Sequence, residues 1–422
     1  MSTTARQEQF FRTAMLFPLI GGYVFVNFHR VSMAVMAPDL MSEFLFGATA
    51  IGFISSLFFY AYTASQIPIG LMADMVGTRQ VVSLALAITA LGALIFGSAT
   101  NAPLIFIGRM IMGIGVAGIY PPAMKLFAQW YEGDSFSSIT GLYIACGNLG
   151  AVLAAAPFAY VVGRWGWRQS HIFIGIITLG LALSAWLFIR EGPGQIDQTR
   201  TGSGINWGQA WGSFKEAISN KAVLYVGFLL FLKYGPYMGV QGLWGIPFFM
   251  DVYNMDRVTA GSLLSFMPIG YMVGAPITGF FLARRIGTKK SLYFAAAILM
   301  ILTWLPLTIP LPGVNIWLFR LAFLFLGIGS SAQGVLTFSL ARDVADPRVA
   351  GTTMALVSAF PFAAATLFQP FMGAVLDLFG AGAVGFSGES YYLAFRLCFL
   401  ALILLFFGVL RLPTGKGEEA HS

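Results

Sequence analysis

The chain has 422 residues, of which 58% are hydrophobic and only 10% are charged, and its formal net charge is +7. Soluble domains carry about 25% charged residues, so this composition excludes an ordinary cytosolic enzyme. The basic balance is explained below by membrane topology, and we expect no nucleic-acid partner. The two cysteines, Cys146 and Cys398, both lie in apolar runs, so we expect neither a disulfide framework nor a metal site, and no cofactor.

Apolar runs of about 20 residues recur along the chain, and each is long enough to cross a ~30 Å hydrocarbon core as a helix. Helices and closed barrels are the only structures that span a bilayer, and runs of this length are helical. We therefore predict an all-α membrane protein with twelve transmembrane helices. The predicted spans are 13–37, 49–73, 80–100, 103–127, 137–162, 168–190, 221–246, 258–283, 289–311, 315–340, 349–376 and 391–411.

The first run is expected to be an uncleaved span, because it exceeds the apolar region of a signal peptide and lacks a small-x-small cleavage site. With the N-terminus inside, most Lys and Arg fall on cytoplasmic segments, and only Arg164, Arg168 and Arg257 fall outside. This asymmetry follows the positive-inside rule. It predicts a multi-pass plasma-membrane protein, in a bacterial inner membrane, with both termini in the cytoplasm.

The longest break between apolar runs, 191–220, divides the predicted spans six and six. We predict an N-terminal six-helix bundle at 1–190, a cytoplasmic linker at 191–220 and a C-terminal six-helix bundle at 221–422. The first part of the linker is rich in Gly, Ser and Pro, whereas its second part predicts an amphipathic helix on the cytoplasmic leaflet. The apolar face of that helix comprises Trp207, Ala210, Trp211, Phe214 and Ile218.

A sequence signature lies at the end of the second predicted span, where Gly70, Asp74, Gly77 and Arg79 form the pattern G-x-x-x-D-x-x-G-x-R. The segment 280–290 echoes it in the second half, with Arg284 in place of the Asp. The first copy resembles the signature between spans two and three of the major facilitator superfamily. The resemblance implies two pseudo-symmetric six-helix bundles, and a conformational latch in which Asp74 accepts hydrogen bonds at a helix N-terminus while Arg79 pairs across the loop.

Five cations lie inside predicted spans without a carboxylate at the same depth: Arg30, Arg109, Lys233, Arg320 and Arg396. A charge at membrane depth costs about 2.5 to 3.5 kcal/mol on insertion scales. We therefore expect such a residue either to pair with another group or to have a function. Arg30 and Lys233 are near mid-depth, and their missing partner could be an anionic substrate. The other three lie close to the outer ends of their spans, where snorkelling or pairing near the surface is the commoner fate.

Several local matches are similar to the anion:cation symporter and organophosphate antiporter branches of this superfamily. They are the segment 27–38 around Arg30, Lys233 followed by Tyr and Gly, the Tyr…Gln-x-Pro-x-Gly pattern of 60–70, and 118–122. The resemblance implies a substrate site on spans that line a central cavity, and a gating role for Arg109. The implied substrate-binding residues are Arg30, Lys233, Tyr62, Gln66 and Tyr120.

Differences from those branches narrow the class of substrate and the mode of coupling. Phosphate-ester antiporters carry a lysine where Gln66 stands and a histidine where Gly147 stands, which argues against a phosphate dianion. Proton-coupled members carry Asp where His29 stands and often a glutamate near Ile119, so their usual proton route is in doubt. His29 is itself a proton-coupling candidate because imidazole titrates near neutrality, although a packed neutral histidine is the alternative.

These observations together predict a monomeric secondary active transporter. It would move a small organic, carboxylate-like anion across the bilayer by alternating access, through proton-coupled symport or exchange against a counter-anion. One alternative is an exporter of drugs or amphiphilic metabolites in which the cations are structural. Another is a non-transporting membrane sensor on the same fold. A membrane enzyme is disfavoured, because no nucleophile, paired acid or metal cluster lies at any one depth.

Overall fold

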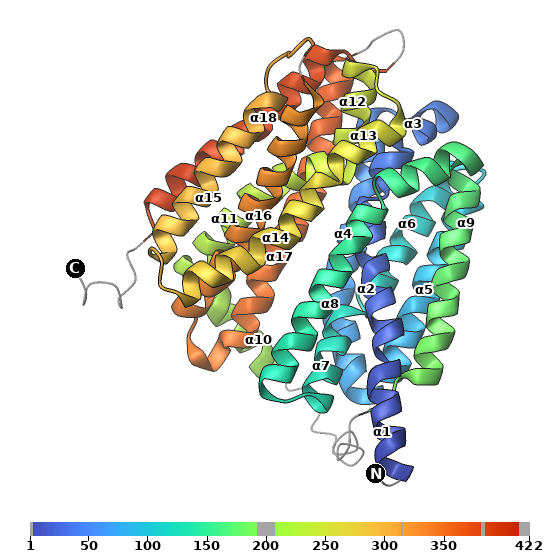
Figure 1. The fold of residues 1–422 in the computed structure, drawn as a ribbon, viewed down its shortest axis with the longest axis vertical. Helices are drawn as coiled ribbons and strands as arrows, with labels where there is room; N and C mark the ends of the chain where they lie inside the picture. Colours follow the sequence, from blue (N-terminus) through green and yellow to red (C-terminus); the bar gives the residue numbers. More distant parts are fainter. Residues whose placement is uncertain (1–2, 192–206, 314, 381–384, 413–422) are drawn as a thin grey trace. The chain divides into compact units, whose positions relative to one another are not determined.

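The computed structural model describes residues 3–191, 207–313, 315–380 and 385–412, without the side chains of 3–8, 67, 71, 74, 207–210 and 347. Throughout this described part the regular elements are helices, with no strand, as predicted. Twelve helical segments are long and apolar enough to cross a membrane, six within residues 9–188 and six within 221–410 (Figure 1). The prediction of twelve transmembrane helices is therefore confirmed.

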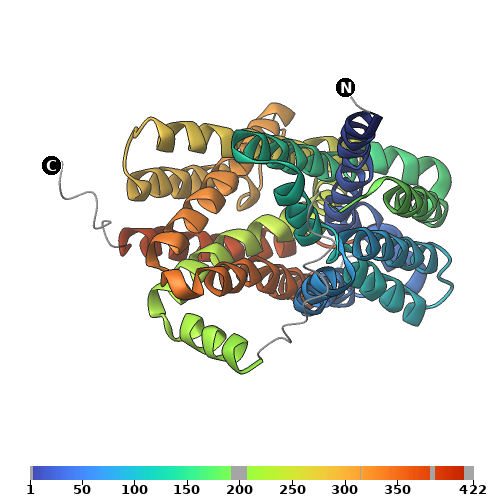
Figure 2. The same ribbon diagram turned by 90° about the horizontal axis from the view of Figure 1, so that it is seen from below.

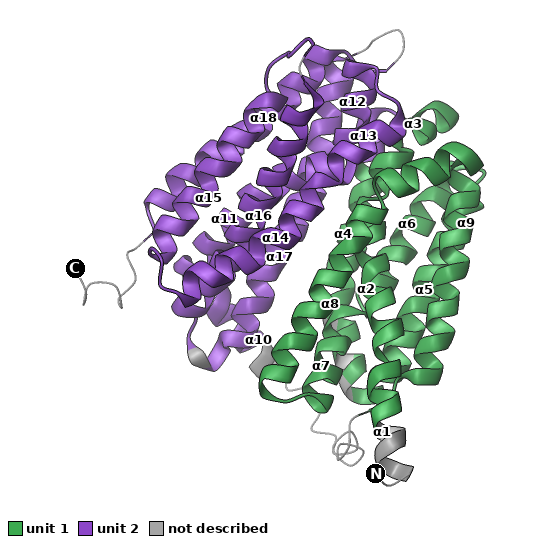
Figure 3. Ribbon diagram, in the orientation of Figure 1, with its two compact units in different colours: residues 1–46, 53–204 green, residues 47–52, 205–422 purple. Residues whose placement is uncertain are grey.

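The chain divides into two compact units, which Figure 3 distinguishes by colour. Unit 1 comprises residues 1–46 and 53–204, and unit 2 comprises 47–52 and 205–422. The helices of unit 1 are α1 (Thr3–Ala14), α2 (Leu16–Val31), α3 (Met33–Phe44), α4 (Ala48–Val76, whose first turn groups with unit 2), α5 (Thr78–Gly97), α6 (Ala102–Val116), α7 (Tyr120–Trp130), α8 (Gly133–Leu153) and α9 (Ala156–Phe188).

The fifth predicted span, 137–162, contains an interruption that its continuous apolar run does not predict. Helix α8 ends at Leu153, and α9 already begins at Ala156 because Pro157 occupies its first turn, where its missing N–H and fixed φ cost nothing. Helix α9 then continues to Phe188 through a kink at Gly166, whose φ of 75° is open to glycine at little cost. Gly166 lies in the predicted connection between residues 162 and 168, so the break in helical geometry there agrees with that connection.

Unit 2 contains α10 (Trp207–Ser219), α11 (Lys221–Gly239), the π-helical turn η2 (Val240–Trp244), α12 (Gly245–Tyr253), α13 (Arg257–Leu264), α14 (Phe266–Ala283), α15 (Lys289–Trp304), the 3₁₀ turn η3 (Leu305–Leu307), α16 (Ile316–Val344), the 3₁₀ turn η4 (Pro347–Val349), α17 (Ala350–Phe379) and α18 (Gly388–Leu410). Polar residues with short side chains begin many of these helices. The side-chain oxygen of each N-cap accepts a hydrogen bond from an otherwise unsatisfied amide of the first turn. These caps are Asn220, Asp256, Thr288, Asn315 and Ser387.

Close backbone approach in unit 2 depends on glycine. Helices α14 and α16 pack along their length, and Gly270 and Gly327 lie at their contact. A Cβ added at Gly270 would overlap the carbonyl of Leu324, and one added at Gly327 would overlap the carbonyl of Met267. Small residues at such contacts let membrane helices gain van der Waals packing, which replaces the hydrophobic driving force that lipid does not provide.

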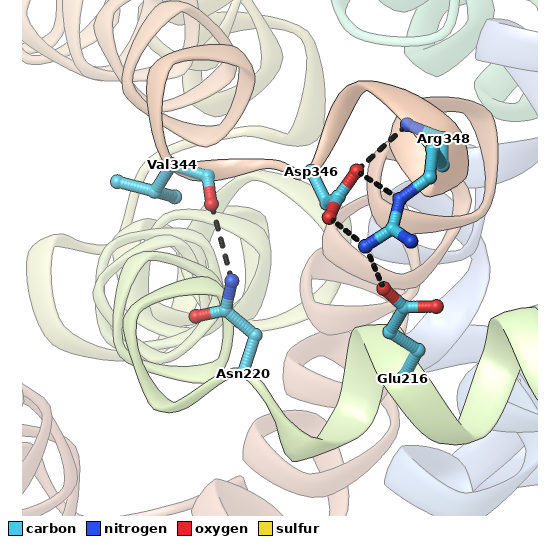
Figure 4. Close-up of polar contacts among 5 residues, drawn as sticks. All are labelled: Glu216, Asn220, Val344, Asp346 and Arg348. Atoms are coloured by element: carbon cyan, nitrogen blue, oxygen red, sulfur yellow. Dashed lines mark hydrogen bonds and ion pairs between the residues drawn. The ribbon is translucent and has the colours of Figure 1, made fainter.

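Helix α10 lies alongside α17 at one end of unit 2 (Figure 2). Figure 4 shows its Glu216 and the loop residue Asp346 both reaching Arg348, with Arg348 Nη2 at 3.5 Å and 2.7 Å from the two carboxylates. The hydrogen bonds from Arg348 lower the pKa of Asp346 to about 2. Asn220 adds a hydrogen bond of 3.1 Å to the carbonyl of Val344. These contacts hold α10 against the α16–α17 connection.

The predicted amphipathic helix at the end of the linker coincides with α10, and its apolar side chains Trp211, Phe214 and Ile218 are exposed. Trp211 and Phe214 stack with ring centroids 5.6 Å apart. The side chains of Trp207 and Ala210, which complete the predicted apolar face, lie outside the described residues. Attachment of this face to the membrane surface stays a prediction.

Candidate functional site

Arg30 lies on α2, immediately before the last residue of that helix, and its side chain is half-buried. Its Nη1 donates a hydrogen bond of 3.2 Å to Oδ1 of Asn27, one turn earlier. Asn27 in turn donates to the carbonyl of Tyr23 at 3.2 Å. Residues one turn apart lie above one another on a helix face, so this ladder aligns Arg30 along α2. Arg30 is also close enough to Tyr23 and Tyr62 to interact with them electrostatically.

Tyrosines from three helices stack beside this arginine. Tyr23 of α2 lies against Tyr143 of α8 with centroids 4.6 Å apart, and against Tyr120, the first residue of α7, at 5.2 Å. Tyr62 of α4 is buried, interacts with Tyr120 and hydrogen-bonds with Gln66. Four of the predicted substrate-binding residues, Arg30, Tyr62, Gln66 and Tyr120, thus belong to one neighbourhood of unit 1.

The neighbourhood also explains Gly147, where phosphate-ester antiporters have a histidine. A Cβ added at Gly147 would overlap the ring of Tyr23. Tyr23 therefore occupies the space that any side chain at position 147 needs. The absence of a side chain at Gly147 is therefore what makes room for the Tyr23 ring.

Lys233 is the corresponding cation of unit 2, and its side chain is only 1% exposed on α11. Its Nζ lies 5.5 Å from the ring centroid of Tyr234 and 5.7 Å from that of Tyr271 on α14. A Cβ added at Gly334 of α16 would lie 3.7 Å from this Nζ and 3.5 Å from the Tyr271 hydroxyl. No carboxylate of the described chain lies within 4.0 Å of the ammonium. The buried charge has aromatic neighbours and no countercharge.

A local change of helix type follows Lys233. The α-helix gives way to the π-helical turn at Val240–Trp244, a geometry that is frequent at functional sites. Trp244 Nε1 donates to the carbonyl of Gln369 at 3.0 Å, while Gln369 Nε2 donates to the carbonyl of Met238 at 3.2 Å. These hydrogen bonds join α17 to α11 and η2, on the C-terminal side of Lys233.

The side chain of Arg109 does not extend toward the membrane surface, although this is common for an arginine near the end of a span. Its side chain is 0% exposed, and its Nη1 donates to the carbonyl of His29 at 2.8 Å. The guanidinium also lies over the ring of Phe58, 4.7 Å from its centroid. Helix packing of α6 against its neighbours, rather than distance from the span end, decides this burial, because the side chain points into the bundle.

His29 is also fully buried, and its imidazole lies next to a second buried imidazole, that of His171 on α9, with centroids 6.0 Å apart. His171 lies near the start of the predicted sixth span, 168–190, where the hydropathy pattern does not single it out. The remaining two cations lie near span ends. Arg396 pairs with Glu389 at 2.8 Å, and Arg320 lies over the ring of Trp317 at 4.5 Å.

The predicted latch residues lie where α4 meets α5. Gly77 is the N-cap of α5 with φ 94°, a conformation that favours glycine. The guanidinium of Arg79 donates to the carbonyl of Trp186 at 2.7 Å and lies over its ring at 4.4 Å. Glu191 accepts from the Arg79 amide at 3.1 Å, a helix-terminus contact that the sequence analysis does not anticipate. The side chain of Asp74 lies outside the described residues, and Gly70 has open space around it.

An ion pair of unit 1 joins Glu43, beyond the first span, to Arg168 of α9. Arg168 lies 2.5 Å from Glu43, and the Trp167 indole donates to the same carboxylate at 3.0 Å. The hydrogen bond from Arg168 holds the pKa of Glu43 below its usual value. This pair joins the end of α3 to the kinked region of α9.

Sequence reasoning missed several residues of these two neighbourhoods. Tyr23 and Asn27 precede Arg30 on the same face of one helix, so helical periodicity would have found them. Tyr143 and Tyr271 come from other helices, and nothing in the linear sequence marks them as neighbours of the two cations.

Comparison with known proteins gives the family. The family model described as Major Facilitator Superfamily matches residues 19–360, and again 226–421. A probable hexose phosphate transport protein of Chlamydia muridarum is 24% identical over 98% of this chain and 93% of its own length. The membrane sensor protein UhpC of Salmonella typhimurium is 22% identical over 88% of this chain and 86% of its own length. A probable sulfoacetate transporter, SauU, of Cupriavidus necator is 28% identical over 40% of each chain.

A solved structure agrees at the level of fold. The bacterial homologue of the human lysosomal transporter Spinster, in an inward-facing and unoccupied conformation, has a TM-score of 0.75 and 17% identity. The match covers 95% of this chain and 97% of that chain. With the family model spanning most of the sequence and twelve membrane-spanning helices, this multi-pass membrane protein belongs to the Major Facilitator Superfamily of transporters and is not an enzyme.

Proposed function

We propose that this protein moves a small organic anion, a carboxylate or sulfonate with one negative charge at the recognised group, across the membrane by alternating access. Arg30 and Lys233 are its anion-binding cations, and Tyr62, Gln66 and Tyr120 contact the rest of the substrate. The membrane is a bacterial inner membrane, the termini are cytoplasmic, and the transporter works as a monomer.

The observation that carries this proposal is the buried ammonium of Lys233. Moving a charge from water into a low-dielectric interior costs several kcal/mol, and a fixed countercharge usually offsets that cost. The described residues provide none here, and two aromatic faces at 5.5 and 5.7 Å supply only part of the compensation. A transported anion supplies the missing charge each time it binds, and its departure leaves a site ready for another anion.

Arg30 suits the same ligand in a different way. A guanidinium presents a planar fork that matches the two oxygens of a carboxylate or sulfonate, whereas an ammonium acts as a mobile point charge. Asn27 holds Arg30 at 3.2 Å from one side, so part of the orientation is established before the ligand arrives. Such preorganisation reduces the entropy that binding must overcome.

The tyrosine stack favours a single negative charge over a phosphate dianion. Gln66 and Gly147 stand where phosphate-ester antiporters carry a lysine and a histidine, and Tyr23 fills the space next to Gly147. The relative SauU is a probable sulfoacetate transporter, and sulfoacetate carries a sulfonate and a carboxylate. The longer match to a hexose phosphate transporter keeps phosphate esters as the competing substrate class.

We propose anion exchange as the coupling mode, with proton symport as the competing mode. When no anion is bound, the two cations are uncompensated, and this disfavours reorientation of the empty carrier. A carrier that reorients only when loaded must exchange one anion for another. His29, the proton-coupling candidate, is sealed from solvent in unit 1, so a direct route for protons between it and a bound anion is not supported. Gly70, Asp74, Gly77 and Arg79 act as the conformational latch, and Arg109 contributes to gating by holding α2.

The experiment is uptake into proteoliposomes with radiolabelled acetate, sulfoacetate, a sugar acid and glucose 6-phosphate, with and without a proton gradient. Counterflow without a gradient supports exchange, whereas uptake that requires an inward proton gradient supports symport. Lys233→Met and Arg30→Gln should each abolish uptake of active anions, while Lys215→Met on the exposed face of α10 should not.

Two outcomes would redirect the assignment. Binding of an anion without any transport would favour a sensor, in line with the similarity to UhpC. Transport of cationic or neutral amphiphiles that survives both cation substitutions would favour an exporter in which Arg30 and Lys233 are structural.

A further inference from the structure

Three buried polar side chains of unit 1, from α2, α6 and α9, lie close together: His29, Arg109 and His171. Each is 0% exposed, and the two imidazole centroids are 6.0 Å apart. Arg109 makes one hydrogen bond, from Nη1 to the His29 carbonyl at 2.8 Å. Its Nε and Nη2, and both ring nitrogens of each histidine, have no hydrogen-bond partner among the described residues and no contact with solvent.

The surroundings of this cluster are aromatic. Phe58 faces the guanidinium at 4.7 Å, and Phe96 lies 4.8 Å from the His171 ring. No described carboxylate pairs with Arg109. Six nitrogen atoms from three helices are therefore buried without a hydrogen-bond partner among the described residues.

Such a cluster does not stay unsatisfied in a stable fold. Nearly all buried polar groups in proteins bond to protein or to internal water. The free edge of Arg109 only donates, whereas each neutral imidazole both donates and accepts. Water matches this set, since it accepts from the guanidinium and donates to a ring nitrogen, and internal waters are typically held by two to four polar partners.

We propose that unit 1 binds ordered water between His29, Arg109 and His171, as an internal hydration site at the break of the first span. Helix α2 ends at Val31, and α3 begins at Met33. In a continuous α-helix the His29 carbonyl would accept from the Met33 amide. That bond is not formed between these two described helices, and Arg109 bonds to the carbonyl instead.

The hydrated cluster therefore holds the break that follows Arg30. Water satisfies the edge of Arg109 that faces away from the carbonyl, so the guanidinium keeps one fixed orientation. The site is a property of unit 1 alone and does not depend on the identity of the substrate.

X-ray radiolytic footprinting of the full chain in lipid nanodiscs tests the proposal, because hydroxyl radicals form at bound water and label adjacent side chains. Phe58 and Phe96, although 0% exposed, should be labelled severalfold faster than Phe395, an equally buried ring in unit 2. Equal labelling of all three rings would show a dry cluster and overturn the proposal.

Two variants sharpen the result. His171→Phe removes two of the nitrogens and should reduce labelling of Phe96 severalfold, while His171→Gln keeps polar atoms and should retain most of it. Unchanged labelling in a folded His171→Phe protein would contradict the site. A severalfold loss of labelling in His171→Gln would contradict it as well, and this test does not require the phenylalanine variant to fold. Thermal stability that rises with chloride relative to gluconate in wild type, and not in Arg109→Gln, would assign a halide to the cluster and overturn the water proposal.

Discussion

Replacing Lys233 with methionine tests the anion site most directly, because the change removes the charge and keeps nearly the same volume. The ammonium is 1% exposed and has no described countercharge, so an anion bound beside it forms a desolvated pair. Truncating one partner of such a pair costs about 2–5 kcal/mol of binding free energy. We expect the dissociation constant of an active anion to rise by roughly 30-fold to several thousand-fold, at about 1.4 kcal/mol per factor of ten.

The same substitution should have the opposite effect on the empty protein. An uncompensated buried charge destabilises the fold, and apolar replacements of buried ionic groups are often neutral or stabilising by about 1–4 kcal/mol. The methionine also fills the space between the rings of Tyr234 and Tyr271, where thioether–aromatic contacts are favourable. The apo melting temperature of Lys233→Met should therefore equal or exceed that of wild type.

The assay is thermal unfolding of both proteins in detergent, with and without saturating anion, together with ligand titration. A wild-type melting temperature that rises with anion, and a variant that starts at least as high but no longer responds, would support the reasoning. If Lys233→Met melts lower than wild type when empty and still binds the anion equally well, Lys233 is a structural residue and the argument fails. Lys215→Met, on the exposed face of α10, should change neither quantity.

Three further predictions concern packing and charge. Gly270→Ala should destabilise the fold by about 1–3 kcal/mol through overpacking, whereas Gly279→Ala, with open space around it, should be neutral or stabilising by up to about 1 kcal/mol in chemical denaturation. Gly147→Ala should reduce stability because its Cβ meets Tyr23, and the loss should shrink in the Tyr23→Leu background; equal losses in both backgrounds would contradict the contact. Glu43→Gln should cost about 0.2–1 kcal/mol at neutral pH. Because the pKa of Glu43 is lowered, its contribution is complete above the ordinary glutamate value of about 4.3 and is lost as the pH falls through the lowered pKa, so the difference in melting temperature should vanish in acid.

The number and approximate positions of the spans follow from sequence alone. A bilayer is a uniform apolar solvent, so a run of about 20 apolar residues forms a helix there whatever its neighbours are. The same local logic identifies Arg30 and Lys233 as cations at mid-depth. It also predicts a helix near the end of the linker, from the spacing of Trp211, Phe214 and Ile218.

Helix rotation and helix breaks are different, because they depend on contacts between segments far apart in the chain. Arg109 stands near a span end in the sequence, yet packing of α6 turns it into the bundle toward the His29 carbonyl. Packing of α9 against α2 brings His171 beside His29, and no local sequence pattern predicts that pairing. Only the tertiary structure could show that Tyr23 fills the space next to Gly147, or that Lys233 is enclosed by Tyr234 and Tyr271 without a carboxylate. Hydropathy is a property of each segment and determined the spans, whereas the surroundings of each charge are properties of the packed bundle.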